Sequence, residues 1–128
     1  MFAVWPSAPK RVWGPKGWRW LHLEAISFPA EPTPAEAART AARIRAFVES
    51  LPCPECRTHA QAALRRSPPD LAGSHALQVW AWELHNAVNA RLKKPRHSYG
   101  AYLAAYADEI EWAERVGGAF RARARRLA

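Results

Sequence analysis

Cysteine is scarce in this sequence, with Cys53 and Cys56 the only two among 128 residues. A structural zinc site usually draws on a second close-spaced pair of ligands, and the chain has no further cysteine to form one. The same shortage means that electrons taken up by the pair cannot pass to another disulfide within the chain. Any redox chemistry at this pair therefore needs a partner or a bound acceptor.

Long apolar runs and strand patterns are also missing. No apolar run approaches the roughly 20 positions that span a bilayer, and the first residues lack the apolar centre of a signal peptide. We therefore expect no membrane association, and the compartment is left open. Because no segment alternates apolar and polar residues as a half-buried strand does, the expected class is all-α.

The charge is strongly basic, at +8 with a pI near 10.3, which would suit a nucleic-acid ligand. The basic residues are scattered along the chain, however, and cluster only in the final stretch FRARARRLA. A solvated basic end explains that cluster better than a specific binding arm. Nucleic acid is therefore disfavoured as a partner.

Proline, glycine and capping residues divide the chain into helices. The predicted helices cover 14–28, 34–51, 53–66, 74–93 and 98–115. The first should start near Gly14-Pro15, the second has the capping-box pattern of Thr33, Pro34 and Glu36, and Ser74 should cap the fourth. We predict a four-helix bundle with a short fifth helix, comprising an extended arm at 1–12, a domain at 13–115 and a basic tail at 116–128.

The second helix carries an apolar seam that steps by four and three residues. Its members are Ala37, Ala41, Ile44, Val48 and Leu51. Such a seam can pack inside the bundle or against a second copy of the chain.

The motif CPEC places two sulfurs at the start of the third helix, where unpaired backbone N–H groups favour a thiolate. A zinc half-site would need two further ligands, from among His22, His59, His75, His85 and His97. A thioredoxin-like pair would need strands, which are missing. A catalytic dithiol on a helical bundle remains, and it requires an electron acceptor.

The fourth helix offers a place for such an acceptor. His85 and Asn89 lie one turn apart on a single face, with Asn86 beside them. Polar side chains inside a bundle need a polar ligand to satisfy them. A flavin, which is a flat ring with polar edges, would suit this environment.

Three motifs in this order resemble the Erv/ALR family of FAD-dependent sulfhydryl oxidases: WGPKGWRWLH, then PCPEC, then WAWELHNAVNARLKKP. The resemblance covers about residues 13 to 106. It implies a helical bundle with FAD at its mouth, with Cys56 next to the flavin and Cys53 meeting the substrate. It also implies oxidation of a protein dithiol or a thioredoxin-like carrier, with O2 reduced to H2O2, and a homodimer formed through the first two helices.

By the same resemblance, twelve positions correspond to cofactor-binding residues. These are Gly14, Lys16, Trp18, His22, Phe28, Trp82, His85, Asn86, Asn89, Lys93, Lys94 and Tyr106. Tyr102 and Trp112 are rivals of Tyr106 for the adenine side. No metal is expected.

The chain departs from the family at a further disulfide that cellular members carry. The corresponding positions hold Trp82 and Tyr99, which could replace that link by packing edge to face. Short family members without an extra cysteine pair, as here, resemble those encoded by large DNA viruses. A viral origin would place the protein in the host cytoplasm. The mitochondrial intermembrane space is the alternative. Two other functions stay open: a small basic module stabilised by zinc, and an FAD-binding scaffold without turnover.

Overall fold

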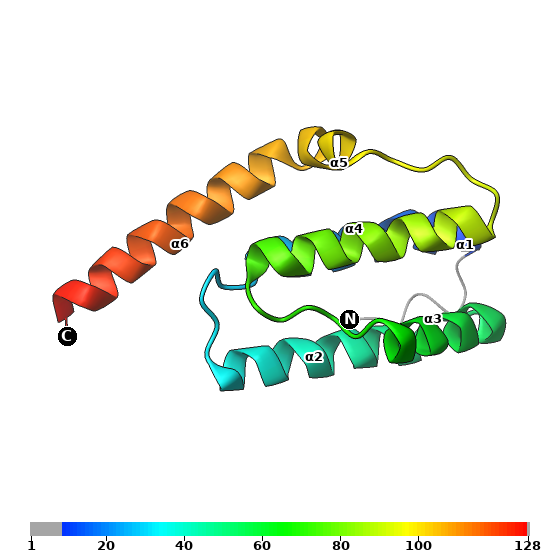
Figure 1. The fold of residues 1–128 in the computed structure, drawn as a ribbon, viewed down its shortest axis with the longest axis horizontal. Coiled ribbons are helices and arrows are strands. Elements are labelled where there is room, and N and C mark those ends of the chain that lie inside the picture. The colour runs from blue at the N-terminus through cyan, green and yellow to red at the C-terminus, as the bar shows by residue number, and fades with distance from the viewer. Residues whose placement is uncertain (1–8, 128) are drawn as a thin grey trace.

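The computed structural model describes residues 9–127, with side chains through Gly117. Over this range the chain forms six helices and no strand: α1 (Lys10–Ser27), α2 (Pro34–Glu49), α3 (Pro54–Arg66), α4 (Ser74–Arg91), α5 (Tyr99–Ala105) and α6 (Ala107–Leu127). The prediction of an all-α class is confirmed (Figure 1). No helix within the described range is long and apolar enough to cross a membrane.

The main core lies where α1 packs along α4, with α2 contributing from below (Figure 1). Leu21 and Ala25 of α1, Leu77 and Ala81 of α4, and Ile44 of α2 are all buried there. Truncating a side chain as buried as Leu77, which is 1% exposed, costs about 2–5 kcal/mol of stability. This contact fixes the relative positions of α1 and α4.

A second apolar cluster joins α1, α2 and the start of α3, and it explains why α1 begins earlier than predicted. Trp13 is buried against Phe47, Val48 and Leu51. Burial of the Trp13 ring favours a helical backbone in the turn before it, so α1 starts at Lys10. The helix continues through Pro15, although proline supplies no N–H. The predicted start at Gly14-Pro15 is wrong by about one turn, and residues 10–12 of the predicted extended arm are helical. Residues 1–8 of that arm lie outside the described residues.

The capping box of α2 is confirmed, because the Thr33 hydroxyl accepts from the Glu36 N–H at 3.1 Å and the Glu36 carboxylate accepts from the Thr33 N–H at 2.9 Å. The seam on α2 packs inside the chain. Ile44, Val48 and Leu51 are buried within a single copy. Of the two options that the sequence left open, these three residues take internal packing.

The start of α4 is tied to the end of α1. Gly73, rather than the predicted Ser74, is the N-cap of α4. A Cβ at Gly73 would lie 2.5 Å from the carbonyl oxygen of Ala30, so only glycine fits this approach. The Ser74 hydroxyl instead donates to the carbonyl of Ala25 at 2.8 Å.

The end of α4 has the geometry of a Schellman motif. Lys93 adopts a left-handed φ of 59°. Its N–H bonds to the Ala90 carbonyl at 3.2 Å, and the Lys94 N–H bonds to the Asn89 carbonyl at 2.8 Å. The helix therefore ends at Arg91, two residues before the predicted Lys93, and the chain turns back toward α5.

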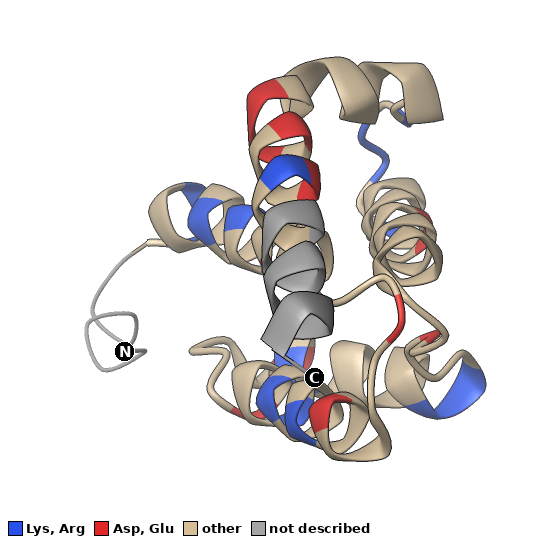
Figure 2. Ribbon diagram, turned by 90° about the vertical axis from the view of Figure 1, so that its left-hand side faces the viewer, with Lys and Arg blue, Asp and Glu red and all other residues tan. Residues whose placement is uncertain are grey.

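The predicted last helix, 98–115, is divided at Tyr106 and extends further than expected. α6 continues through Gly117-Gly118 to Leu127 and leads away from the bundle (Figure 1). Figure 2 shows acidic residues in its first turns. Asp108 and Glu109 in the first turn complement the positive end of the helix dipole.

Candidate functional site

Cys53 and Cys56 form a disulfide at the start of α3. Cys53 is the N-cap residue, and its sulfur accepts a hydrogen bond from the Cys56 N–H at 3.2 Å. Pro54 occupies the first helical position, where its missing N–H costs nothing. This local sequence therefore holds the Cys53 sulfur at the positive end of the α3 dipole.

The disulfide has one side on protein and one open to solvent. Both cysteines are partly exposed, and both pack against the second apolar cluster of Trp13, Phe47 and Leu51. The apolar side fixes the sulfurs, while the exposed side admits a thiolate from another molecule. The pair can therefore undergo thiol–disulfide exchange.

A second group of functional side chains lies where α1 faces α4. The rings of Trp18 and His85 stack with centroids 4.0 Å apart and planes 10° apart. His22 Nε2 lies 3.1 Å from His85 Nδ1, so one nitrogen donates and the other accepts. Three residues that the sequence singled out are thereby brought together from two helices.

Burial determines the charge of both histidines. Loss of hydration lowers the pKa of His22 to about 4. The pKa of His85 is also lowered to about 4, first by burial and then by the nearby His22, His97 and Lys94. Both imidazoles are therefore neutral at pH 7, and the group presents polar edges without charge.

Two buried polar atoms in this region have no hydrogen-bond partner among the described residues: His22 Nδ1 and Asn89 Nδ2. A third such atom, Glu109 Oε2, belongs to α6. Buried donors and acceptors are nearly always satisfied in native proteins. Flat rings beside two unsatisfied polar atoms fit a planar ligand with polar edges, as the sequence predicted.

Tyrosines of α5 and its C-terminal junction cover His22. The rings of Tyr102 and Tyr106 lie 5.1 and 5.3 Å from the His22 ring. The Tyr102 hydroxyl donates to Gln78 Oε1 at 2.8 Å, and burial raises the pKa values of both tyrosines. Tyr106 and its rival Tyr102 therefore both lie against His22. Gln78 was missed, because only the folded position of α5 makes it a partner.

The other predicted cofactor residues are not among the stacked and hydrogen-bonded rings of this group, although Lys94 lies close enough to His85 to lower its pKa. Phe28 is part of the main core. On α1, Gly14 is partly buried and Lys16 is exposed, and Lys93 and Lys94 are exposed at the end of α4. Trp82 and Asn86 hydrogen-bond the backbone of His97. Trp112, the second rival of Tyr106, is 61% exposed on α6.

A cavity of about 1160 Å³ lies between α6 and the bundle. Its lining includes Phe28, Gln78 and Tyr99, but none of Trp18, His22 or His85. Within the described part of the chain, no three His, Cys, Asp or Glu side chains are grouped so that they could hold a metal ion.

Fold and site together define an all-α protein with a disulfide at a helix start and a buried group of aromatic and polar side chains between α1 and α4. A model of the Erv1 / Alr family matches residues 15–112. The chain belongs to the Erv1 / Alr family, as the motifs in its sequence predicted.

Curated relatives are FAD-linked sulfhydryl oxidases. One from African swine fever virus (isolate Pig/Kenya/KEN-50/1950) is 43% identical over 98 residues, which cover 77% of this chain and 82% of the viral protein. FAD-linked sulfhydryl oxidase ERV2 of Saccharomyces cerevisiae is 31% identical over 97 residues, covering 76% of this chain and 50% of that protein.

Solved structures of yeast Erv1 share the fold. The crystal structure of the yeast Erv1 core matches with a TM-score of 0.74 and 27% identity, covering 79% of this chain and 86% of that one. The FAD-binding domain of Erv1 from Saccharomyces cerevisiae matches with a TM-score of 0.70 and 28% identity, covering 75% of this chain and 91% of that one.

Proposed function

We propose that this chain is a FAD-dependent sulfhydryl oxidase that forms disulfide bonds in dithiol substrates and passes the electrons to O2, giving H2O2. The observation that carries the proposal is the combination of a solvent-accessible disulfide with two buried, unpartnered polar atoms beside stacked rings. The family and the FAD-linked relatives support the same activity.

The disulfide performs the exchange with substrate. A substrate thiolate attacks the Cys53 sulfur, the Cys53–Cys56 bond breaks, and Cys56 leaves as a thiolate. A second substrate thiolate then attacks the substrate sulfur, so that the product disulfide forms and Cys53 leaves as a thiolate. The Cys56 N–H, 3.2 Å from the Cys53 sulfur, and the N-terminus of α3 stabilise that leaving group.

FAD, when bound, supplies the two-electron acceptor that reoxidises the dithiol and the reduced flavin that reacts with O2. The residues that would hold it are Trp18, His22, His85, Asn89 and Tyr106. Trp18 and the histidines supply flat surfaces, and His22 Nδ1 and Asn89 Nδ2 supply polar contacts that are otherwise unmet. Lys93 and Lys94 would contribute positive charge toward the pyrophosphate.

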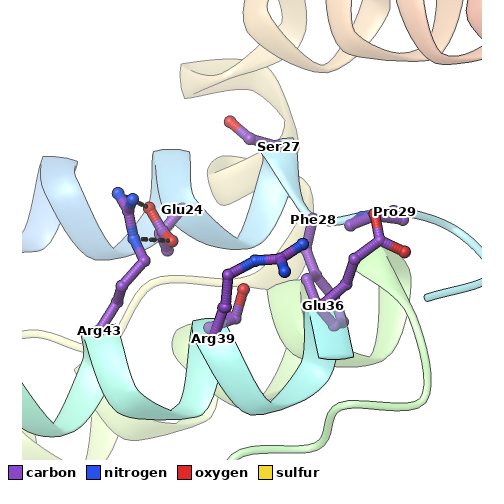
Figure 3. Close-up of a pocket in the computed structure, with 8 residues that line it drawn as sticks. Glu24, Ser27, Phe28, Pro29, Glu36, Arg39 and Arg43 are labelled. Carbon is purple, nitrogen blue, oxygen red and sulfur yellow. Dashed lines mark hydrogen bonds and ion pairs between the residues drawn. The ribbon is translucent and has the colours of Figure 1, made fainter. Parts of the chain in front are cut away.

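The partners are a protein dithiol or a thioredoxin-like carrier. We also propose a homodimer through exposed surfaces of α1 and α2, because the buried seam of α2 is not free for that contact. This face holds a cavity of about 280 Å³ lined by Glu36, Arg39 and Thr40, among others. Two of its lining residues form an ion pair, with Arg43 Nε 2.7 Å from a Glu24 oxygen (Figure 3). Sedimentation as a monomer at micromolar concentration would contradict the dimer.

The viral relatives support a setting in the host cytoplasm. The mitochondrial name of yeast ERV1 keeps the intermembrane space as the alternative. Localisation of the full chain in an infected or transfected cell would separate the two.

A direct test uses purified full-length protein. We expect a yellow sample with flavin absorption bands that consumes O2 and releases an equivalent of H2O2 for each disulfide formed in a small dithiol. Cys56→Ala should keep the flavin and lose the O2 consumption. A colourless protein that contains zinc would contradict the proposal, and a yellow protein without turnover would show a scaffold instead.

A further inference from the structure

Two side chains of α4 bind the backbone of one residue, His97, in the segment between α4 and α5. Trp82 Nε1 and Asn86 Nδ2 both donate to the His97 carbonyl oxygen at 2.9 Å. Asn86 Oδ1 accepts from the His97 N–H, also at 2.9 Å. We name this set of Trp82, Asn86 and His97 the His97 clamp. It satisfies both backbone polar groups of His97 at once.

The position of the clamp determines where α5 begins. Ser98, the next residue, is the N-cap of α5, and its hydroxyl accepts from the Ala101 N–H at 3.0 Å. Tyr99 then meets Trp82 edge to face, with ring centroids 5.3 Å apart and planes at 77°. The edge-to-face contact predicted from the sequence is confirmed. The first turn of α5 is therefore held to α4 by hydrogen bonds and by ring packing.

The same anchoring reaches the candidate cofactor site. Tyr102, one turn into α5, is 4% exposed, and its ring lies 5.1 Å from that of His22. A slip of α5 by one residue would rotate its side chains by about 100°. The Tyr102 and Tyr106 rings would then lose their places over His22. The clamp thus sets the register of the rings that cover this site.

None of these contacts involves sulfur. Cys53 and Cys56, the only cysteines of the chain, lie at the start of α3. Reduction of the Cys53–Cys56 disulfide therefore breaks none of the contacts of the clamp. In addition, the Asn86 side chain amide is bonded at both ends to His97, which leaves it poorly placed to bind a cofactor directly.

We propose that Trp82 and Asn86 are positioning residues that hold α5 over His22 through the His97 clamp, so that the cofactor site stays assembled under reducing conditions. The inference rests on the proposed function, since it concerns the same site. It assigns Asn86 an indirect role, in place of the direct contact that the family resemblance implies.

The test compares two variants that each remove one hydrogen bond of the clamp: Asn86→Asp, which keeps the shape of the side chain, and Trp82→Phe, which keeps an aromatic ring. Asn86→Asp keeps the acceptor for the His97 N–H but turns the donor toward the His97 carbonyl into a carboxylate oxygen. Trp82→Phe keeps an aromatic ring against Tyr99 but loses the Nε1 donor. Trp112→Phe, at an indole that is 61% exposed on α6, is the matched control.

Hydrogen exchange of backbone amides is measured first on the cofactor-free protein. The amides of Ala101 and Tyr102 report on the first turn of α5. Loss of one clamp hydrogen bond should accelerate their exchange about tenfold in Asn86→Asp and Trp82→Phe. The control variant should not change them, and the amides of α4 around Ala81 should stay as they are in the wild type. The same two variants should release FAD faster.

The outcomes separate the possibilities. Faster FAD release with unchanged exchange at Ala101 and Tyr102 would make Asn86 a direct ligand and overturn the proposal. Reduction of the wild-type disulfide with a phosphine should leave the exchange at Ala101 and Tyr102 unchanged. If it accelerates that exchange as much as the two substitutions do, the clamp depends on the disulfide and the proposal is overturned. A wild-type protein that never binds FAD would refute the proposed function, whereas the exchange data would still decide whether the clamp positions α5.

Discussion

His22 Nε2 and His85 Nδ1 lie 3.1 Å apart, so two imidazoles from different helices share a single hydrogen bond. Protonation of either ring would remove the nitrogen that accepts this hydrogen bond or would place a positive charge next to the other ring. Because burial lowers both pKa values to about 4, this pair should make the cofactor-free protein sensitive to acid.

Acid should destabilise the fold through these histidines. Unfolded histidines titrate near pH 6.5, so between pH 6.5 and 4 the unfolded chain binds protons that the folded chain does not, and stability falls as the pH falls. For His22 the loss at pH 4.5 should be about 2 kcal/mol. It should be smaller for the half-buried His85. Urea unfolding of the cofactor-free protein at pH 7 and pH 4.5 measures this loss of stability.

A variant isolates this effect from the titration of carboxylates. His22→Leu should lose markedly less stability than the wild type between the two pH values. His59→Leu, on the exposed side of α3, should behave as the wild type does. Equal losses in the wild type and His22→Leu would mean that His22 is not held neutral by burial.

The two cysteines should differ in reactivity. Only the Cys53 sulfur accepts the Cys56 N–H at the start of α3, and a thiolate there gains from the helix dipole. In Cys56→Ser, which leaves Cys53 free, alkylation by iodoacetamide at pH 7 should run about tenfold faster than in Cys53→Ser. Mass spectrometry over time gives both rates. A faster reaction at Cys56 would assign the substrate-facing role to the other sulfur.

Asn89 should matter for cofactor binding rather than for folding. Its Nδ2 is buried without a partner, and an unsatisfied buried donor costs about 1–3 kcal/mol. Asn89→Leu should therefore leave the cofactor-free protein as stable as the wild type or more so. The increase in melting temperature on adding FAD should shrink. A large loss of stability without FAD would show that the Asn89 amide supports the fold itself.

Local rules predicted the parts of the fold that depend on neighbours in the sequence. The capping box of Thr33 and Glu36 and the start of α3 at the cysteine pair needed only spacing and residue type. The start of α1 could not be found in this way, because Trp13 finds its burial partners on α2. Tertiary packing overrode the local signal of Pro15 there.

The candidate site likewise combines residues that the sequence identifies with contacts that only the fold determines. Helical spacing brought out His85 and Asn89, and family motifs brought out Trp18 and His22. The binding of Asn86 to the His97 backbone depends on the path of a loop that carries no periodic signal. Sequence alone could therefore name Asn86 as important, but it could not say what the side chain binds.

Two glycines should respond oppositely to alanine. At Gly73 a Cβ would meet the Ala30 carbonyl oxygen at 2.5 Å, so Gly73→Ala must shift the start of α4 and should cost about 2 kcal/mol or more. At Gly14, inside α1, nothing lies within 4 Å of a Cβ, and Gly14→Ala should stabilise the helix by up to about 1 kcal/mol. Thermal unfolding compares them. A stable Gly73→Ala would mean that the junction of α1 and α4 is loose.

Lys93 combines a strained backbone with a charge near the proposed pyrophosphate position. Its φ of 59° is unfavourable for a residue with a Cβ, and glycine at this position of a Schellman motif should raise the stability of the cofactor-free protein by about 1 kcal/mol. Lys94→Gly, one residue later, also removes one positive charge but relieves no backbone strain, so it should not stabilise the cofactor-free protein. Thermal unfolding without FAD therefore separates the two variants.

Titration with FAD then tests the charges themselves. If both lysines act on the pyrophosphate, each variant should bind FAD several-fold more weakly at low salt, and the deficit should narrow as salt screens the wild-type attraction. Lys93→Gly would then be more stable without FAD and weaker in binding it, which is the signature of backbone strain retained for a ligand. Unchanged affinity in both variants would remove these lysines from the cofactor site and leave the strain at Lys93 as a property of the helix end alone.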